Sequence, residues 1–108
     1  MRQAKIYFKG EKAGLLTQLD DGSFTYKYYD LWMSNNIKPS ISLTLPKTKQ
    51  EYKSDYLFPF FYNMLPEGTN KQVVCKYMRI DSDDDFSLLL ITAHYDTIGA
   101  VTVKKITS

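Results

Sequence analysis

The sequence predicts an α+β fold in which a small antiparallel sheet carries about three helices packed on one face. Two observations favour this class. Residues 4–29 alternate between apolar and polar side chains, as half-buried strands do, and only turn residues interrupt them. Residues 59–93 instead repeat their apolar side chains at helical spacing, and a last strand-like segment follows. Because 108 residues is a common length for one domain, residues 1–108 are expected to form a single domain.

Three short strands in a meander are predicted near the N-terminus. Ile6 and Phe8 alternate with more polar neighbours, because successive side chains of a strand point to opposite faces. Gly10 marks the first turn, and Asp21-Gly22 supplies the positive φ angles that a tight hairpin turn needs. The third strand has three aromatic side chains on one face, Phe24, Tyr26 and Tyr28.

Two further strands are predicted. Residues 40–45 alternate again before Pro46 stops the pattern, which indicates a short edge strand. After Gly99-Ala100, Val101 and Val103 alternate with polar neighbours, and this segment has to return to the sheet to be paired. The sheet is therefore expected to contain the meander, the edge strand and the C-terminal strand.

Two helices are predicted before residue 81. The first begins at Pro59, whose missing N–H is no loss in a first helical turn, and ends before Pro66. The second runs from residue 69 or 70 to Ile80. Its apolar stripe consists of Val73, Val74, Tyr77 and Met78.

An acidic cluster at residues 81–85 precedes a third predicted helix, which continues through Phe86 to Ala93. The hydroxyl of Ser82 can cap free N–H groups, and the carboxylates that follow lie at the positive end of the helix dipole. A calcium loop of the EF-hand type needs Gly at its sixth position and Glu at its twelfth. Counting from Asp81, those places hold Phe86 and Thr92, so helix capping is favoured and no metal site is predicted.

Composition excludes several classes of function. The 14 basic and 12 acidic residues are spread along the chain, which argues against a direct nucleic-acid or anionic-membrane surface. No apolar run approaches the ~20 residues that a membrane span needs. Cys75 is the single cysteine and the N-terminus lacks an apolar signal core, so the cytoplasm is the expected location.

The residues that carry enzyme chemistry are sparse. Cys75 and His94 could be read as a nucleophile and its base, but no third orienting group is indicated. Cys75 is instead expected to be a small buried hydrophobe, and His94 to lie near the negative end of a helix. The five glycines, at positions 10, 14, 22, 68 and 99, form no phosphate-binding loop. We therefore predict a protein that is not an enzyme, with no catalytic residue and no cofactor.

A set of ordered motifs runs through nearly the whole chain. The most specific is residues 60–68, Phe-Phe-Tyr-Asn-Met-Leu-Pro-Glu-Gly, and the next is Ile41-Ser42-Leu43 followed by Leu45-Pro46. In this order the motifs resemble the N-terminal domain of HipA-type kinases, whose corresponding segment is Phe-Phe-x-Asn-Leu-Leu-Pro-Glu-Gly. The sequence departs from the family at His94-Tyr95-Asp96, where Gly-x-Asp is common. The shorter motifs are Gly14-Leu15-Leu16, Phe24-x-Tyr26, Phe86-x-Leu88-Leu89 and Gly99-Ala100-Val101.

The resemblance carries an expected function. In the family this domain precedes a serine/threonine kinase core that supplies ATP, magnesium and the catalytic residues, and the sequence reaches Ser108 before any of them. A similar arrangement exists in tripartite HipBST toxin–antitoxin systems, in which the kinase toxin lacks the domain and a separate small protein supplies it. The resemblance thus implies a HipS-like antitoxin that binds and neutralises a HipT-like serine/threonine kinase, alongside a HipB-like DNA-binding protein.

Two other classes remain open. The chain could be an N-terminal structural fragment of a longer HipA-type kinase, or an unrelated small enzyme that uses Cys75 or His94. A kinase encoded nearby without this domain would favour the antitoxin over the fragment.

The partner-binding site is expected in the turn after the first predicted helix. Met64 or Leu65 would be an apolar anchor and Glu67 would lie at the polar rim, because interfaces concentrate their binding energy in a few buried side chains. Met64 replaces the family's leucine, which gives a more adaptable surface if it faces a partner. The same turn could instead only seal the helix onto the sheet. The candidate residues are Asn63, Met64, Leu65, Pro66, Glu67 and Gly68.

Overall fold

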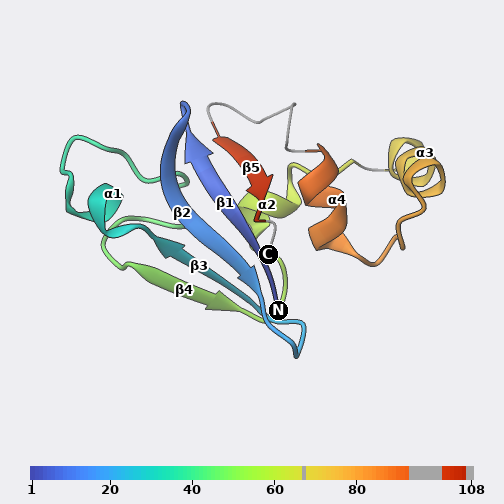
Figure 1. The fold of residues 1–108 in the computed structure, drawn as a ribbon, viewed down its shortest axis with the longest axis horizontal. Coiled ribbons are helices and arrows are strands. Elements are labelled where there is room, and N and C mark those ends of the chain that lie inside the picture. The colour runs from blue at the N-terminus through green and yellow to red at the C-terminus, as the bar shows by residue number, and fades with distance from the viewer. Residues whose placement is uncertain (67, 93–100, 107–108) are drawn as a thin grey trace.

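The structure is a computed structural model that describes residues 1–66, 68–92 and 101–106. One five-stranded sheet forms the body of the molecule, and helices lie beside it and beyond it (Figure 1). In chain order the elements are β1 (Arg2–Phe8), β2 (Glu11–Gln18), β3 (Phe24–Tyr28), α1 (Asp30–Ser34), β4 (Glu51–Ser54), α2 (Pro59–Tyr62), α3 (Gly68–Met78), α4 (Asp85–Thr92) and β5 (Val101–Lys105).

All neighbouring strands of the sheet are antiparallel, in the order β4-β3-β2-β1-β5. The predicted N-terminal meander is confirmed, and the C-terminal strand returns to pair with β1 as expected. Gly10 and Gly22 adopt the positive φ angles, 82° and 89°, that their turns require. The α+β class is therefore confirmed, with four helices in the described part of the chain.

One face of the sheet supplies most of the core. Ala4, Leu16 and Tyr26 lie in one cross-strand row, and all three are fully buried. Gly14 permits this packing, because a Cβ atom at that position would lie only 2.3 Å from the Tyr26 hydroxyl oxygen. The buried side chains of strands, helices and loops join in one cluster, as a protein of this size requires.

The predicted edge strand at residues 40–45 is wrong. That segment is a series of turns, and the edge strand is β4, ten residues further along. A strand would place Ile41, Leu43 and Leu45 on one face, whereas the turn buries Ile41 and Leu45 and leaves Leu43 99% exposed. The backbone N–H of Leu45 donates to the Ser42 carbonyl (3.1 Å), which closes the turn.

The short helix α1 was not predicted. It has a single buried side chain, that of Trp32, whose indole N–H donates to the Pro39 carbonyl at 2.9 Å. The helix α2 is confirmed, with Pro59 in its first turn.

The helix α3 is confirmed, but its predicted apolar stripe does not face the core. Cys75 is its only buried residue, and Val74 is half-buried against the core. Val73 and Tyr77 are 58% and 85% exposed, and Met78 is also exposed. The predicted stripe grouped residues from two sides of the helix, because adjacent helical residues such as Val73 and Val74 point about 100° apart.

The helix α4 begins three residues after the predicted cap. Asp84, not Ser82, receives the capping hydrogen bond, from the backbone N–H of Ser87 at 3.2 Å. This follows the usual geometry, in which the side chain before the helix accepts from the third helical residue. The apolar side chains of Phe86, Leu88 and Leu89 then pack into the core.

The helices differ in how they meet the body. Helix α4 packs against β5 and α2, and α1 packs against β2. Helix α3 lies beyond α4 at one end of the molecule, so it extends the longest of the 43 × 29 × 27 Å dimensions rather than covering the sheet (Figure 1). None of the helices in the described ranges is long and apolar enough to cross a membrane.

Candidate partner-binding site

The turn that follows α2 lies next to a cluster of aromatic side chains. Phe61 is fully buried, and its ring lies 5.9 Å from that of Tyr26 on the sheet. Phe58 and Phe60 flank Phe61 with edge-on rings at 6.4 and 5.2 Å. Aromatic pairs are favourable beyond the area that they bury, so the contact between Phe61 and Tyr26 helps to hold α2 against the sheet.

The backbone of the turn continues the helical path for three residues. The N–H groups of Asn63, Met64 and Leu65 donate to carbonyls three or four residues earlier, each at 3.0 Å. Pro66 has no N–H to continue the pattern. Gly68 then begins α3 with a φ of +56°, a left-handed conformation that glycine adopts without strain.

The structure separates the candidate residues into two groups. Leu65 is 7% exposed and belongs to the core, whereas Met64 and Pro66 are half-buried at the surface. Asn63 and Gly68 are exposed. Glu67 lies outside the described residues. Met64 is thus the large apolar side chain of the turn that reaches both the core and the surface.

A hollow of about 220 Å³ lies beside this turn. Two of its lining residues, Tyr62 and Lys71, were not predicted. Tyr62 is 49% exposed, although it follows directly after the buried Phe61. The signal in the sequence was that Tyr62 stands at the variable position of the family motif, where a side chain is free to point outward.

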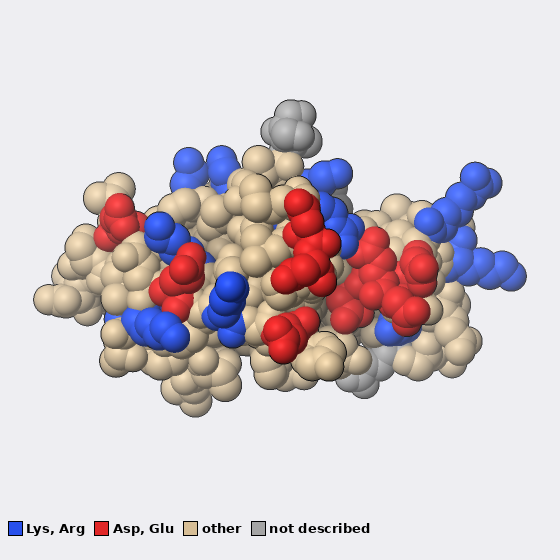
Figure 2. Space-filling view, turned by 90° about the horizontal axis from the view of Figure 1, so that it is seen from below, with Lys and Arg blue, Asp and Glu red and all other residues tan. Residues whose placement is uncertain are grey.

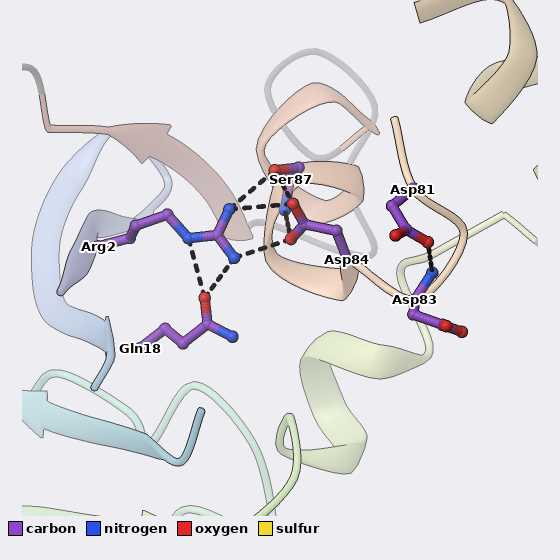
Figure 3. A network of polar contacts seen from close by, with 6 residues as sticks. All are labelled: Arg2, Gln18, Asp81, Asp83, Asp84 and Ser87. Atoms are coloured by element: carbon purple, nitrogen blue, oxygen red, sulfur yellow. Dashed lines mark hydrogen bonds and ion pairs between the residues drawn. The ribbon is translucent and has the colours of Figure 1, made fainter. Parts of the chain in front are cut away.

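A polar cluster, apart from the turn, joins the start of β1 to the start of α4 (Figure 3). The guanidinium of Arg2 donates to the two carboxylate oxygens of Asp84, at 2.8 and 3.2 Å, and to the Ser87 hydroxyl at 2.9 Å. It also donates to the amide oxygen of Gln18 and lies 4.9 Å from the centre of the Phe86 ring. These contacts fasten α4 to the sheet.

The acidic residues around Asp84 are used within the fold. Hydrogen bonds from Arg2 lower the pKa of Asp84 to about 2, and the hydroxyl and N–H of Ser87 add to this effect. Burial instead raises the pKa of Asp85. The carboxylate of Asp81 accepts the backbone N–H of Asp83 at 3.0 Å. Among the described residues, no three His, Cys, Asp or Glu side chains gather as metal ligands.

Of the two residues considered for catalysis, the structure describes only Cys75. Cys75 is 8% exposed, which agrees with its predicted place as a small buried hydrophobe. His94 lies outside the described residues.

Charged residues are unevenly distributed over the face shown in Figure 2. Acidic side chains gather over the region where α4 begins, and basic side chains project at the adjoining end, where α3 lies. The formal charge of +2 therefore conceals two regions of opposite sign. Such regions favour different partners or different parts of one partner.

Comparison with known proteins supports one family. The HipA N-terminal domain model matches residues 4–104. A solved structure, the N-terminal domain of HipA toxin, superposes with a TM-score of 0.72 at 28% identity and covers 100% of this chain and 95% of its own. An uncharacterized protein of Haemophilus influenzae is 31% identical over 105 residues, covering 97% of this chain and 93% of that protein.

Two relatives from Sinorhizobium fredii are much longer. They are named "Putative kinase Y4mE" and "Putative kinase Y4dM", with 26% and 30% identity over 82% and 87% of this chain. The chain spans only 21% and 24% of their lengths. Since the family model covers residues 4–104 and the fold agrees with it, this chain belongs to the HipA N-terminal domain family.

Proposed function

We propose that this protein is a non-catalytic, cytoplasmic antitoxin of the HipS type, which binds and neutralises a HipT-like serine/threonine kinase. A HipB-like DNA-binding protein would join through the complex. The observation that carries the proposal is a difference in length among relatives. The domain makes up about a fifth to a quarter of the kinase-named proteins but matches 93% of the Haemophilus influenzae protein. The family therefore includes a protein of about one domain's length, which supports a role for the domain apart from a kinase core.

The turn at residues 63–68 is the surface that we assign to the kinase. Met64 is half-buried, so its outer part can enter a partner while its inner part keeps contact with the core. Its unbranched side chain adapts to an apolar pocket. Asn63 is exposed beside it, and the hollow lined by Tyr62 and Lys71 can receive a side chain from the partner. Glu67 completes the proposed polar rim.

A second candidate function is favoured by the kinase-named relatives. In them a domain of this kind is part of a much longer chain. The chain could thus be one part of a HipA-type kinase, and the same turn would then contact its own kinase core. Sequencing the gene beyond codon 108 distinguishes the two, because a continuous kinase reading frame would support this second candidate.

The antitoxin proposal predicts a HipT-like kinase gene beside the gene for this chain, and the test uses that kinase. The purified kinase is assayed for transfer of labelled phosphate with increasing amounts of the protein. We expect a stoichiometric complex on size-exclusion chromatography and loss of kinase activity. A kinase that neither binds the protein nor slows in its presence contradicts the proposal.

Substitutions at Met64 and Leu43 test whether the turn is the binding surface. Met64→Asp places a carboxylate in the proposed apolar contact and should weaken inhibition by about tenfold or more. Leu43→Asp is the matched control, because Leu43 is 99% exposed in a different loop. Leu65→Ala is unsuitable as a binding probe, since emptying a buried leucine site costs about 2–5 kcal/mol of stability. Equal inhibition by folded Met64→Asp protein would remove the turn from the interface.

A further inference from the structure

The helix α3 has an apolar face that the rest of the chain does not use. Its inward side holds Cys75 and the half-buried Val74. On the opposite side Val73 and Tyr77 are 58% and 85% exposed, and residues four apart lie one above the other on a helix. We call Val73, Lys76 and Tyr77 the outward face of α3. Contiguous exposed apolar surface with a polar rim marks interaction sites, and Val73 and Tyr77 form such a surface on α3.

All charged side chains of α3 and of the two residues after it are basic. Residues 68–80 contain Lys71, Lys76 and Arg79 and no Asp or Glu. Lys76 and Arg79 are exposed, and Figure 2 shows basic side chains projecting from this end of the molecule. A partner surface that fits α3 therefore carries carboxylates. A second copy of α3 fits poorly, because it would bring like charges together.

Helix α3 protrudes from the molecule, which indicates that a partner would contact it with a groove. Helix α3 lies at the end of the long axis and protrudes from the body, so it is convex (Figure 1). A convex helix with an apolar pair docks into a groove, as amphipathic helices do in many complexes. Tyr77 suits the centre of such a contact, since tyrosine is among the residues that most often dominate interface energy.

We propose that the outward face of α3 docks into a groove of the kinase partner whose floor is apolar and whose rim carries carboxylates. The proposal rests on the kinase-binding function proposed above and extends the contact beyond residues 63–68. The two surfaces are neighbours in the chain, because the turn at residues 63–68 leads directly into α3, which begins at Gly68. One partner can therefore contact both.

The test uses residues 1–108 and the HipT-like kinase that the proposed function predicts, with affinity measured by titration calorimetry at low and high salt. Val73→Ser with Tyr77→Ser should weaken binding by about tenfold or more. Lys76→Glu should weaken binding at low salt and reduce the salt dependence, because one attractive charge becomes repulsive. Circular dichroism checks folding, which these exposed sites should leave intact.

Two control variants separate the helix from the general surface. Leu43→Ser removes an equally exposed apolar side chain, and Lys53→Glu reverses an exposed charge on β4; both should keep the wild-type affinity. Wild-type affinity in the folded α3 variants overturns the α3 contact and leaves the proposed function standing. Failure of the wild-type protein to bind the kinase overturns both. A dimer in light scattering that the α3 variants dissociate would instead assign the outward face to a second copy.

Discussion

Tyr26 and Tyr28 are buried on the same face of β3, but their hydroxyl groups have different surroundings. The hydroxyl of Tyr28 donates to the Leu45 carbonyl and accepts the backbone N–H of Ile41 at 3.1 Å. The hydroxyl of Tyr26 has no hydrogen-bond partner among the described residues. Burial accordingly raises the pKa of Tyr26 far above its ordinary value.

This difference predicts opposite results for the same substitution. Tyr28→Phe should lower the free energy of unfolding by about 1–3 kcal/mol, because it leaves buried backbone groups of the 41–45 turn without a partner. Tyr26→Phe removes an unpaired hydroxyl, so it should leave that free energy unchanged or raise it by about 1 kcal/mol. Urea unfolding at neutral pH measures both variants. Equal destabilisation by the two would show that the Tyr26 hydroxyl does have a partner.

Alternation in the sequence placed Phe24, Tyr26 and Tyr28 correctly on the buried face, since that property depends only on the period of a strand. It could not show which hydroxyl finds a partner. The partners of Tyr28 come from a turn 13 and 17 residues away, and such contacts exist only in the folded chain.

At the scale of elements, the contact between Arg2 and Asp84 joins the first strand to the last helix. Hydrogen bonds from Arg2 lower the pKa of Asp84 from its ordinary 3.8 to about 2. Since the folded-state pKa lies below the unfolded-state value, the ion pair adds stability above about pH 4. That stability is lost as the pH falls from about 4 to 2, as the carboxylate gains its proton.

Asp84→Asn should therefore flatten the acid limb of the stability curve. We expect the wild type to lose about 1 kcal/mol more than the variant between pH 5 and pH 2, a modest value because both side chains are partly solvated. Chemical unfolding at a series of pH values provides the comparison. Asp83→Asn is the control, since Asp83 is exposed in the same cluster. Parallel pH curves for wild type and Asp84→Asn would refute the role of the pair.

Elements with a clear period or a clear start signal were predictable, and β4 and α1 were not. The three N-terminal strands and β5 alternate over enough residues to be recognised. β4 has one large apolar residue, Tyr52, and α1 buries only Trp32, so neither repeats a buried apolar side chain that would reveal its period. Residues 40–45 imitated a strand because Ile41 and Leu45 point inward from a turn.

The sequence predicted which segment forms the candidate site, but not which of its side chains are exposed. The motif at residues 60–68 located the turn through its resemblance to the family. Which members face outward depends on how α2 packs, and the structure places Leu65 in the core and Met64 at the surface. Tyr62 and Lys71 complete the hollow from outside the predicted range.

At the scale of the whole molecule, burial is unevenly divided between the sheet and α3. The central strands β1 and β2 are hydrogen-bonded on both sides, whereas α3 buries only Cys75. Local opening is easiest where few apolar contacts have to be broken. The end of the molecule that we assign to the partner is thus a part that contributes little to the stability of the fold.

Hydrogen exchange should reveal this division. We expect amides of α3 in the isolated protein to be protected at least about tenfold less than those of β1 and β2, because α3 can unfold without disturbing the sheet. Mass spectrometry of peptides covering residues 2–18 and 68–78 gives the comparison. Adding the kinase should slow exchange in α3 if it binds there. Equal protection of α3 and the central strands in the free protein would contradict the expected division.

The pairing of β1 with β5 has a consequence for how the protein is made. Phe8 lies opposite Val101 and Ala4 lies opposite Lys105, so β1 finds its second neighbour only in β5, which is synthesised much later. While the ribosome is still adding residues, one side of β1 keeps its N–H and C=O groups unpaired, and such an edge invites association with other nascent chains. Completion of the sheet therefore has to wait until translation has passed residue 105.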